Sequence, residues 1–168
     1  MPRERRRTGS DRRVTGSPRW SGAVLTAAMA LGAWPAAAAA QTPEEAVMVA
    51  AGQWALERLP GGAIRLDPHR TGQGAGEALA RRLAGPLGAQ LATLEDTRRC
   101  ADPTDPSSCS LDADVLLALA APRISGDEAV IRVYAWHRSG DPRAPVAKES
   151  WDVRLARSGG GWRVVSGG

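Results

Sequence analysis

The chain has 168 residues, 43% of them hydrophobic and 24% charged, with six Trp, one Tyr and no Phe. Its formal net charge of +4 belongs to the first forty residues. These hold seven of the 22 basic and two of the 18 acidic side chains and leave residues 41–168 near −1. The pI of about 10.0 therefore does not indicate a nucleic-acid partner or an anionic surface as ligand.

The N-terminal segment has the pattern of an export signal. Residues 1–20 hold seven arginines, residues 21–34 are uncharged, and Pro35 leads into a run of alanines. A basic start, an apolar middle and a small-residue end predict a signal peptide cleaved after Ala38-Ala39-Ala40. The alternative is a membrane anchor, because residues 21–40 are long enough to cross a bilayer. Alanine is a poor membrane former and Pro35 interrupts the run, so cleavage is favoured.

We therefore expect a signal peptide at residues 1–40 and a single α+β domain at residues 41–168, which has the length of one domain. The domain should be periplasmic or extracellular, with membrane contact only through the leader before cleavage. The sequence leaves open whether export follows the general secretory or the twin-arginine route.

The domain is predicted to open with a helix. Thr42 suits the N-cap, Pro43 the first helical position, and Glu45 completes a capping box. Apolar residues recur at helical spacing up to Trp54, and Pro60-Gly61-Gly62 ends the run.

Three further elements follow before the cysteines. We expect a short strand at Ala63–Leu66 and a second helix at Gly76–Ala84, stopped before Gly85-Pro86. The segment Ala89–Glu95 fits either a helix that continues beyond the proline or an edge strand, and we favour the strand. The glycines at 72, 74 and 76 lack the Lys-Ser/Thr of a phosphate loop, so we interpret them as the entry to the second helix.

Cys100 and Cys109 flank a short loop with two prolines. In an exported chain such a pair predicts a disulfide, and its spacing is unlike that of reactive cysteine pairs. The aspartates in and after the loop do not match a calcium loop, because the turn glycine and the final glutamate are absent. The His and Cys content is also too low for zinc. We expect no metal and no cofactor.

Residues 114–166 give the strongest strand signal, because β-branched and aromatic runs alternate with turn residues. Four antiparallel strands are expected, at Asp114–Ala121, Ala129–Arg138, Val146–Ser158 and Trp162–Ser166.

Alternation of apolar and polar residues fixes two registers in this meander. The first pairs Ile131 with Val153, Val133 with Trp151, Arg132 with Asp152 and Trp136 with Lys148. The second has a two-residue type I′ turn at Gly159-Gly160, which pairs Leu155 with Val164 and Arg157 with Trp162. The face expected to pack under the first helix through Trp54 comprises Leu117, Leu119, Ile131, Val133, Trp151, Val153, Leu155 and Val164.

Candidate catalytic residues are scarce. The only histidines are His69, in a loop, and His137, at a strand end, and the sequence contains no G-x-S-x-G elbow. Tyr134 and Trp136, flanked by arginines, could form a binding patch or simply a solvated sheet face. We assign no catalytic residue.

The segment from Val153 to Val165 combines a long strand, a glycine turn and a strand that begins with Trp162. With the element order before it, this pattern resembles the cystatin-like group built around the nuclear transport factor fold. The resemblance implies two N-terminal helices packed on a curved antiparallel sheet of four to six strands. In that group the sheet and helices form a cone, used as an enzyme pocket by ketosteroid isomerases and polyketide cyclases, whereas many members bind without catalysis. The isomerase residues have no match in this sequence.

Two functions are consistent with this reading. The first is a non-catalytic exported module that binds a small apolar ligand or an envelope partner; the alternative is a small lyase, isomerase or hydrolase with His137 or a buried Asp as base. Because the helices are rich in Ala and Gly, the cone should keep an apolar pocket. Its expected lining is Trp54, Leu79, Ile131, Val133 and Trp151, with His137 near the mouth.

Overall fold

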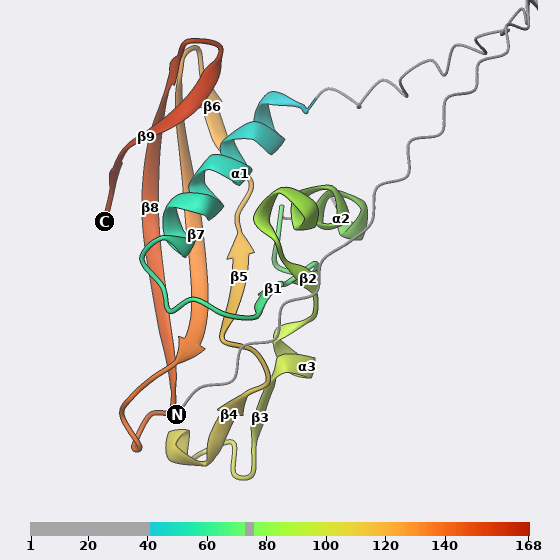
Figure 1. Cartoon of the computed structure of the whole chain (residues 1–168), viewed down its shortest axis with the longest axis vertical. Helices are drawn as coiled ribbons and strands as arrows, with labels where there is room; N and C mark the ends of the chain where they lie inside the picture. The colour runs from blue at the N-terminus through green and yellow to red at the C-terminus, as the bar shows by residue number, and fades with distance from the viewer. Residues whose placement is uncertain (1–40, 73–75) are drawn as a thin grey trace, which may run out of the picture. The chain divides into compact units, whose positions relative to one another are not determined.

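The computed structural model describes residues 41–72 and 76–168 (Figure 1). The expected leader and its cleavage site, and residues 73–75 of the glycine-rich segment, lie outside the described residues. The described part is an α+β domain with a mixed seven-stranded sheet in the order β2-β1-β5-β7-β8-β9, in which β6 also pairs with β7. A separate two-stranded sheet consists of β3 and β4.

Helix α1 (Pro43–Leu56) begins as predicted. The Thr42 hydroxyl accepts a hydrogen bond from the Glu45 N–H, and the Glu45 carboxylate accepts one from the Thr42 N–H. The same carboxylate lies 2.5 Å from Nε of Arg82 on α2 (Gly76–Leu87), which ties the start of α1 to the middle of α2. Gly52 allows the helices to approach closely, because a Cβ there would lie 2.8 Å from a methyl group of Leu87.

Helix α2 is longer than predicted and passes through Pro86. The proline stands in the last turn, where it removes a single helical hydrogen bond, and Leu87 behind it is buried in the core. The helix ends at Gly88, which has φ of +62°. The N–H groups of Gly88 and Ala89 donate to the carbonyls of Gly85 and Ala84, the pattern of a Schellman cap.

Strands β1 (Ile64–Leu66) and β2 (Gln90–Leu91) flank α2 and pair in parallel. The favoured edge strand in the ambiguous segment is thus confirmed for Gln90–Leu91, while Leu94–Thr97 forms a short helix, α3, capped by Thr93. On its other side β1 pairs in parallel with β5 (Val115–Leu119). The expectation of a purely antiparallel sheet of four to six strands therefore needs correction, because the crossover through α2 brings β1 and β2 into the same direction.

Between α3 and β5 the chain forms an arm. Strands β3 (Arg98–Cys100) and β4 (Cys109–Leu111) are antiparallel, and Cys100 and Cys109 face each other and form a disulfide. The 3₁₀ turn η1 (Pro106–Ser108) closes the loop. Asp102 and Asp105 accept hydrogen bonds from the backbone and hydroxyl groups of Thr104 and Ser107, so these acids stabilise turns.

Strand β7 (Glu128–Arg138) pairs with β5 and then with β6 (Arg123–Ser125), so the two short strands together face one long strand. The sequence pattern did not predict β6. The pairing with β7 is interrupted at residues 120–122, between β5 and β6. Gly126-Asp127 then makes the turn into β7. Pro122 has no N–H to donate to a ladder, which explains the break.

The pairing of β7 with β8 (Val146–Ser158) and of β8 with β9 (Gly161–Gly167) confirms both predicted registers. Gly159 and Gly160 have φ of +59° and +87°, as the predicted turn requires. The register shifts by one between Arg154 and Leu155, because Val165 has no partner on β8. Val165 is 62% exposed.

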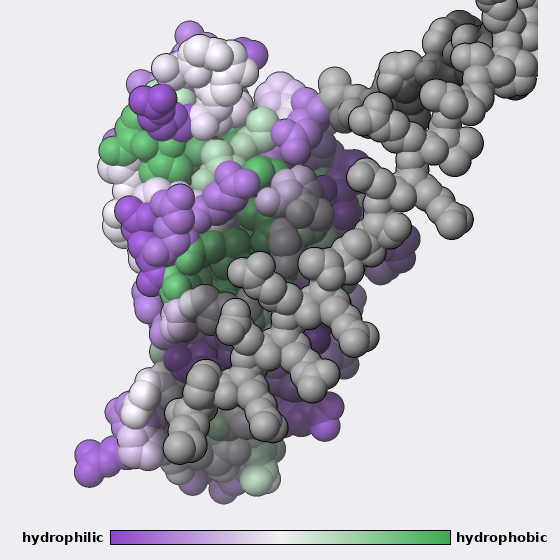
Figure 2. Space-filling view, viewed as in Figure 1, coloured by the Kyte–Doolittle hydropathy of each residue, from purple (hydrophilic) through white to green (hydrophobic). Residues whose placement is uncertain are grey.

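The large sheet has two unlike faces. On the helix side, α1 and α2 cover the apolar face, and all eight residues predicted for it belong to one core cluster with Trp54, some fully and others partly buried. In the view of Figure 2, apolar side chains (green) around α1 lie between hydrophilic ones (purple). The other face, here called the open face, has a second, small cluster of Leu111, Leu116, Ala118 and Trp136 near the arm.

Candidate functional site

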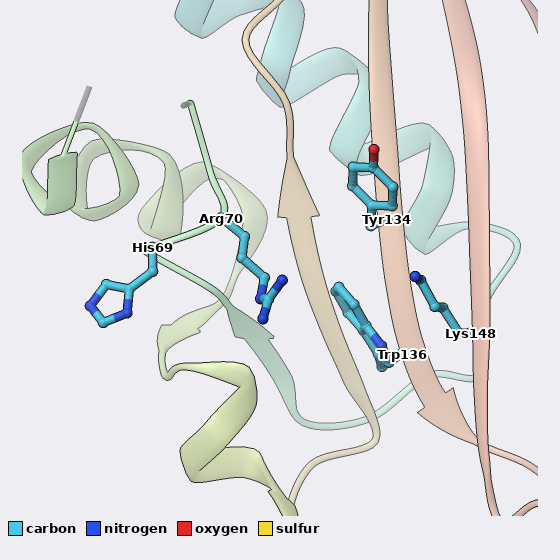
Figure 3. A pocket seen from close by; sticks show the side chains of 5 residues that line it. All are labelled: His69, Arg70, Tyr134, Trp136 and Lys148. Carbon is cyan, nitrogen blue, oxygen red and sulfur yellow. The ribbon is translucent and has the colours of Figure 1, made fainter. Parts of the chain in front are cut away.

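A hollow of about 400 Å³ lies on the open face, where the small apolar cluster ends. Figure 3 looks onto this face, with α1 behind the strands. The hollow, here called the Trp136 hollow, is lined by His69, Arg70, Tyr134, Trp136 and Lys148.

Strands β7 and β8 supply three of these residues through their pleat. Tyr134 and Trp136 are two positions apart on β7 and therefore point to the same face, with ring centroids 6.5 Å apart. Lys148 stands opposite Trp136 on β8. Its ammonium lies 5.7 Å from the Trp136 centroid and 6.0 Å from that of Tyr134, which is cation–π distance for both rings.

The loop after β1 supplies the other two residues, and the buried carboxylate of Asp67 holds it in shape. One oxygen of Asp67 accepts the N–H groups of His69 and Arg70, and the other accepts the N–H of Leu94 at the start of α3. The Gly72 N–H donates to the Leu119 carbonyl, which fastens the far end of the loop to β5. The loop is thus a fixed part of the site.

Arg70 projects from this loop toward Trp136, while the His69 ring points away from it (Figure 3). The guanidinium lies 5.9 Å from the Trp136 centroid. Its Nε is 3.3 Å from Asp67 and one terminal nitrogen is 3.0 Å from Glu95. An arginine has five N–H donors, so several remain available to a ligand.

The two cations of the hollow differ in how far their charge is compensated. Glu95 is kept ionised by a hydrogen bond from its own backbone N–H and by Arg70, which together lower its pKa from the ordinary value of 4.5. Within residues 41–72 and 76–168, no carboxylate forms an ion pair with Lys148. The hollow therefore offers an anion one free ammonium and one anchored guanidinium.

No family model, no curated protein and no solved structure matches this chain.

The apolar residues predicted to line a pocket do come together, but as parts of the core. Trp54, Leu79, Ile131, Val133 and Trp151 belong to one cluster, in which Ile131 and Val133 are at most 1% exposed. The Trp54 and Trp151 rings meet edge to face, with centroids 6.0 Å apart.

His137 also lies where its strand position predicts, near the end of β7 and on the helix side of the sheet. Its Nε2 is 2.9 Å from a carboxylate oxygen of Glu149, and its Nδ1 is 3.0 Å from the Arg138 carbonyl oxygen. His137 is therefore separated from the Trp136 hollow by the sheet itself.

Three of the five residues that line the hollow follow from sequence patterns. The expected pairing of Trp136 with Lys148 is confirmed, and Tyr134 and Trp136 were recognised as a candidate patch. Arg138, the expected neighbour, instead lies 3.8 Å from Asp114 at the strand end. The contribution of Arg70 was missed, because it depends on the parallel pairing of β1 with β5.

Among the helices of the described ranges, none combines the length and apolar composition that a bilayer crossing requires. In the same ranges, no three His, Cys, Asp or Glu side chains are grouped so that they could hold a metal ion.

Proposed function

We propose that the domain is an exported, non-catalytic binding module that takes a small anionic molecule in the Trp136 hollow. The observation that carries this proposal is the convergence of two cations, Arg70 from the β1 loop and Lys148 from β8, on one aromatic ring. The elements that bring them together are far apart in the sequence, and the Asp67 network holds one of them in place.

The lining specifies the ligand chemistry. A carboxylate or phosphate can accept hydrogen bonds from Lys148 and from the remaining donors of Arg70, and such charge-assisted bonds are the strong ones. The half-buried ring of Tyr134 offers a flat apolar surface beside them. The best fit is a small acid that also carries a ring or another apolar part.

Binding is favoured over the alternative of a pocket enzyme. Asp67, the buried acid nearest the hollow, already accepts three backbone hydrogen bonds and pairs with Arg70, so its lone pairs are committed to the loop. His137 faces the other side of the sheet and contacts Glu149. A general base must reach the proton that it removes, and neither residue offers a free lone pair in the hollow.

Export is supported by the disulfide between Cys100 and Cys109, since such bonds persist in oxidising compartments. We expect mature protein from the native host to begin at Gln41 and to contain no free thiol. Intact-mass measurement with and without reductant tests both points. A mass that retains residues 1–40 would favour the anchored alternative.

The resemblance to the cystatin-like group remains a separate proposal. It is supported by the position of α1 across the sheet and by the β8–β9 hairpin. It would place an apolar ligand between helices and sheet, on the face opposite the Trp136 hollow. The NMR titration described next distinguishes the two faces.

The test is a titration of the mature, disulfide-bonded domain with galacturonate, benzoate and inorganic phosphate, followed by two-dimensional NMR. We expect shifts for Tyr134, Trp136 and Lys148 and none around Trp54. Lys148→Gln should weaken binding about tenfold, which corresponds to one charge-assisted contact. Arg157→Gln, an exposed change on the same strand, is the control. The proposal fails if the three acids leave the hollow unshifted, or if the two variants bind alike.

A further inference from the structure

A second hollow, of about 330 Å³, lies beside the first on the open face. It lies where the chain between β5 and β6 leaves the ladder with β7, and the small side chains of Ala120 and Ala121 leave room there. Its lining consists of Ala120, Ala121, Arg123, Val130, Arg132 and Asp152.

This second hollow is also basic. Arg132 and Asp152 are cross-strand partners whose side chains form a bidentate ion pair. The pKa of Asp152 lies below its ordinary value of 3.8, first because of the hydrogen bond from Arg132 and further because Arg123 and Arg154 stand nearby. Arg123 and Arg132 line the hollow, and Arg154 stands two positions from Asp152 on the same face of β8, so the positive charge is in excess.

The two hollows are aligned along the strands. Tyr134 of the first and Arg132 of the second are two positions apart on β7, which corresponds to about 7 Å. Lys148 and Asp152 are four positions apart on β8, or about 13 Å. The open face thus carries two separated groups of cations with the ring of Tyr134 between them.

We propose that this face binds a linear acidic polysaccharide, which places one acidic group in each hollow and a sugar ring on Tyr134. The inference rests on the proposed function, which it extends from one anionic site to two. The separation of the cation groups favours a chain whose charges are spaced by uncharged rings. A nucleic acid, with a phosphate on every nucleotide, would leave the intervening charges uncompensated, and so would a peptide with an acidic side chain at every position.

The test compares glucuronic acid with the trimer and hexamer of hyaluronan, in which an uncharged sugar separates successive acidic sugars, by calorimetry on the mature, disulfide-bonded domain. Engaging both hollows should make the hexamer bind ten- to a hundredfold more tightly than the monomer, roughly as expected for linked sites. The double variant Arg123→Gln/Arg154→Gln should remove this gain and leave monomer binding in the Trp136 hollow unchanged. Both side chains are exposed and form no ion pair among the described residues, so the variant should fold normally. Lys148→Gln should weaken monomer and hexamer alike.

The outcomes separate the two proposals. Equal affinity for monomer and hexamer, with the double variant unaltered, overturns the polymer site and leaves the single-anion site standing. Absence of monomer and hexamer binding overturns both. A length-dependent gain that is as large for polyglutamate or oligothymidylate as for the hyaluronan hexamer overturns the polysaccharide as occupant.

Discussion

At the scale of single residues, we expect substitutions to be tolerated least where a bend of the backbone packs against a carboxylate that it hydrogen-bonds. Asp114 accepts the N–H of Ala63 at 2.7 Å and thereby starts the parallel pairing of β1 with β5. Gly62 precedes Ala63 in the chain and has φ of +139°. A Cβ at this position would lie 2.1 Å from the same carboxylate.

Gly62→Ala should therefore lower the free energy of unfolding by about 1–3 kcal/mol, from backbone strain and the lost Asp114 contact. Gly61→Ala is the matched control, because a Cβ there meets nothing within 4 Å and should change stability by less than about 0.5 kcal/mol. Urea unfolding of both variants measures the difference. Equal midpoints would mean that the Gly62 conformation is not required.

The Arg132–Asp152 pair predicts a pH dependence. Because the folded pKa of Asp152 is lowered, the pair stabilises the fold above the ordinary value of 3.8, and this contribution is lost as the pH falls through the folded pKa. The melting temperature of Asp152→Asn should therefore lie below that of the wild type at pH 7, and the gap should close below pH 3.8. In an Arg132→Gln background the gap at pH 7 should be smaller. A gap that persists at pH 2 would contradict this account.

At the scale of elements, the long strands were predicted together with their register, whereas the short strands were predicted only in part. Alternation over β7 and β8 fixes their register, because a slip by one residue would expose Ile131 and Val153 together. Among the short strands, β1 and β2 lie where strands were expected. The three-residue strands β3, β4 and β6 were not predicted, because they are too short for alternation to appear. The end of α2 was misplaced because Pro86 suggested a stop that the Gly88 cap provides.

The disulfide arm gives the prediction for this scale. Replacing both Cys100 and Cys109 by Ser should lower the free energy of unfolding by about 2–3 kcal/mol, from the chain entropy of a ten-residue loop. The effect should be smaller if the prolines already restrict the reduced loop. Chemical unfolding of the double variant and of reduced wild type measures it, and the two should agree. An unchanged midpoint would show that β3 and β4 hold without the bond.

At the scale of the whole molecule, the sheet divides the domain into a structural side, which the helices cover, and the open face. The structural side could be predicted, because hydrophobic periodicity on β7 and β8 marks the face that α1 covers. The Trp136 hollow on the open face could be predicted only in part, because Arg70 and Trp136 meet only through the pairing of β1, β5 and β7. No local pattern in the sequence encodes that contact.

Trp151→Ala tests this division. Trp151 packs against Trp54 under α1, so its removal should cost on the order of 3 kcal/mol, within the range for a truncated core aromatic. Ser150→Ala, the neighbouring and exposed position on the open face, should change stability by less than about 0.5 kcal/mol. Thermal and urea unfolding measure both variants. Similar midpoints for the two would mean that the faces are assigned the wrong way round.

The register shift at Val165 bears on how readily this domain aggregates with other protein chains. Strand β9 is the last of the sheet, and one row of its backbone groups has no neighbouring strand within the large sheet. Such a row is a template on which other chains can aggregate. The unpaired Val165 bends and twists the strand locally, and the charged Arg163 lies close by on the same strand. A second chain therefore meets a short, kinked and charged border, which resists the edge-to-edge stacking from which fibrils grow.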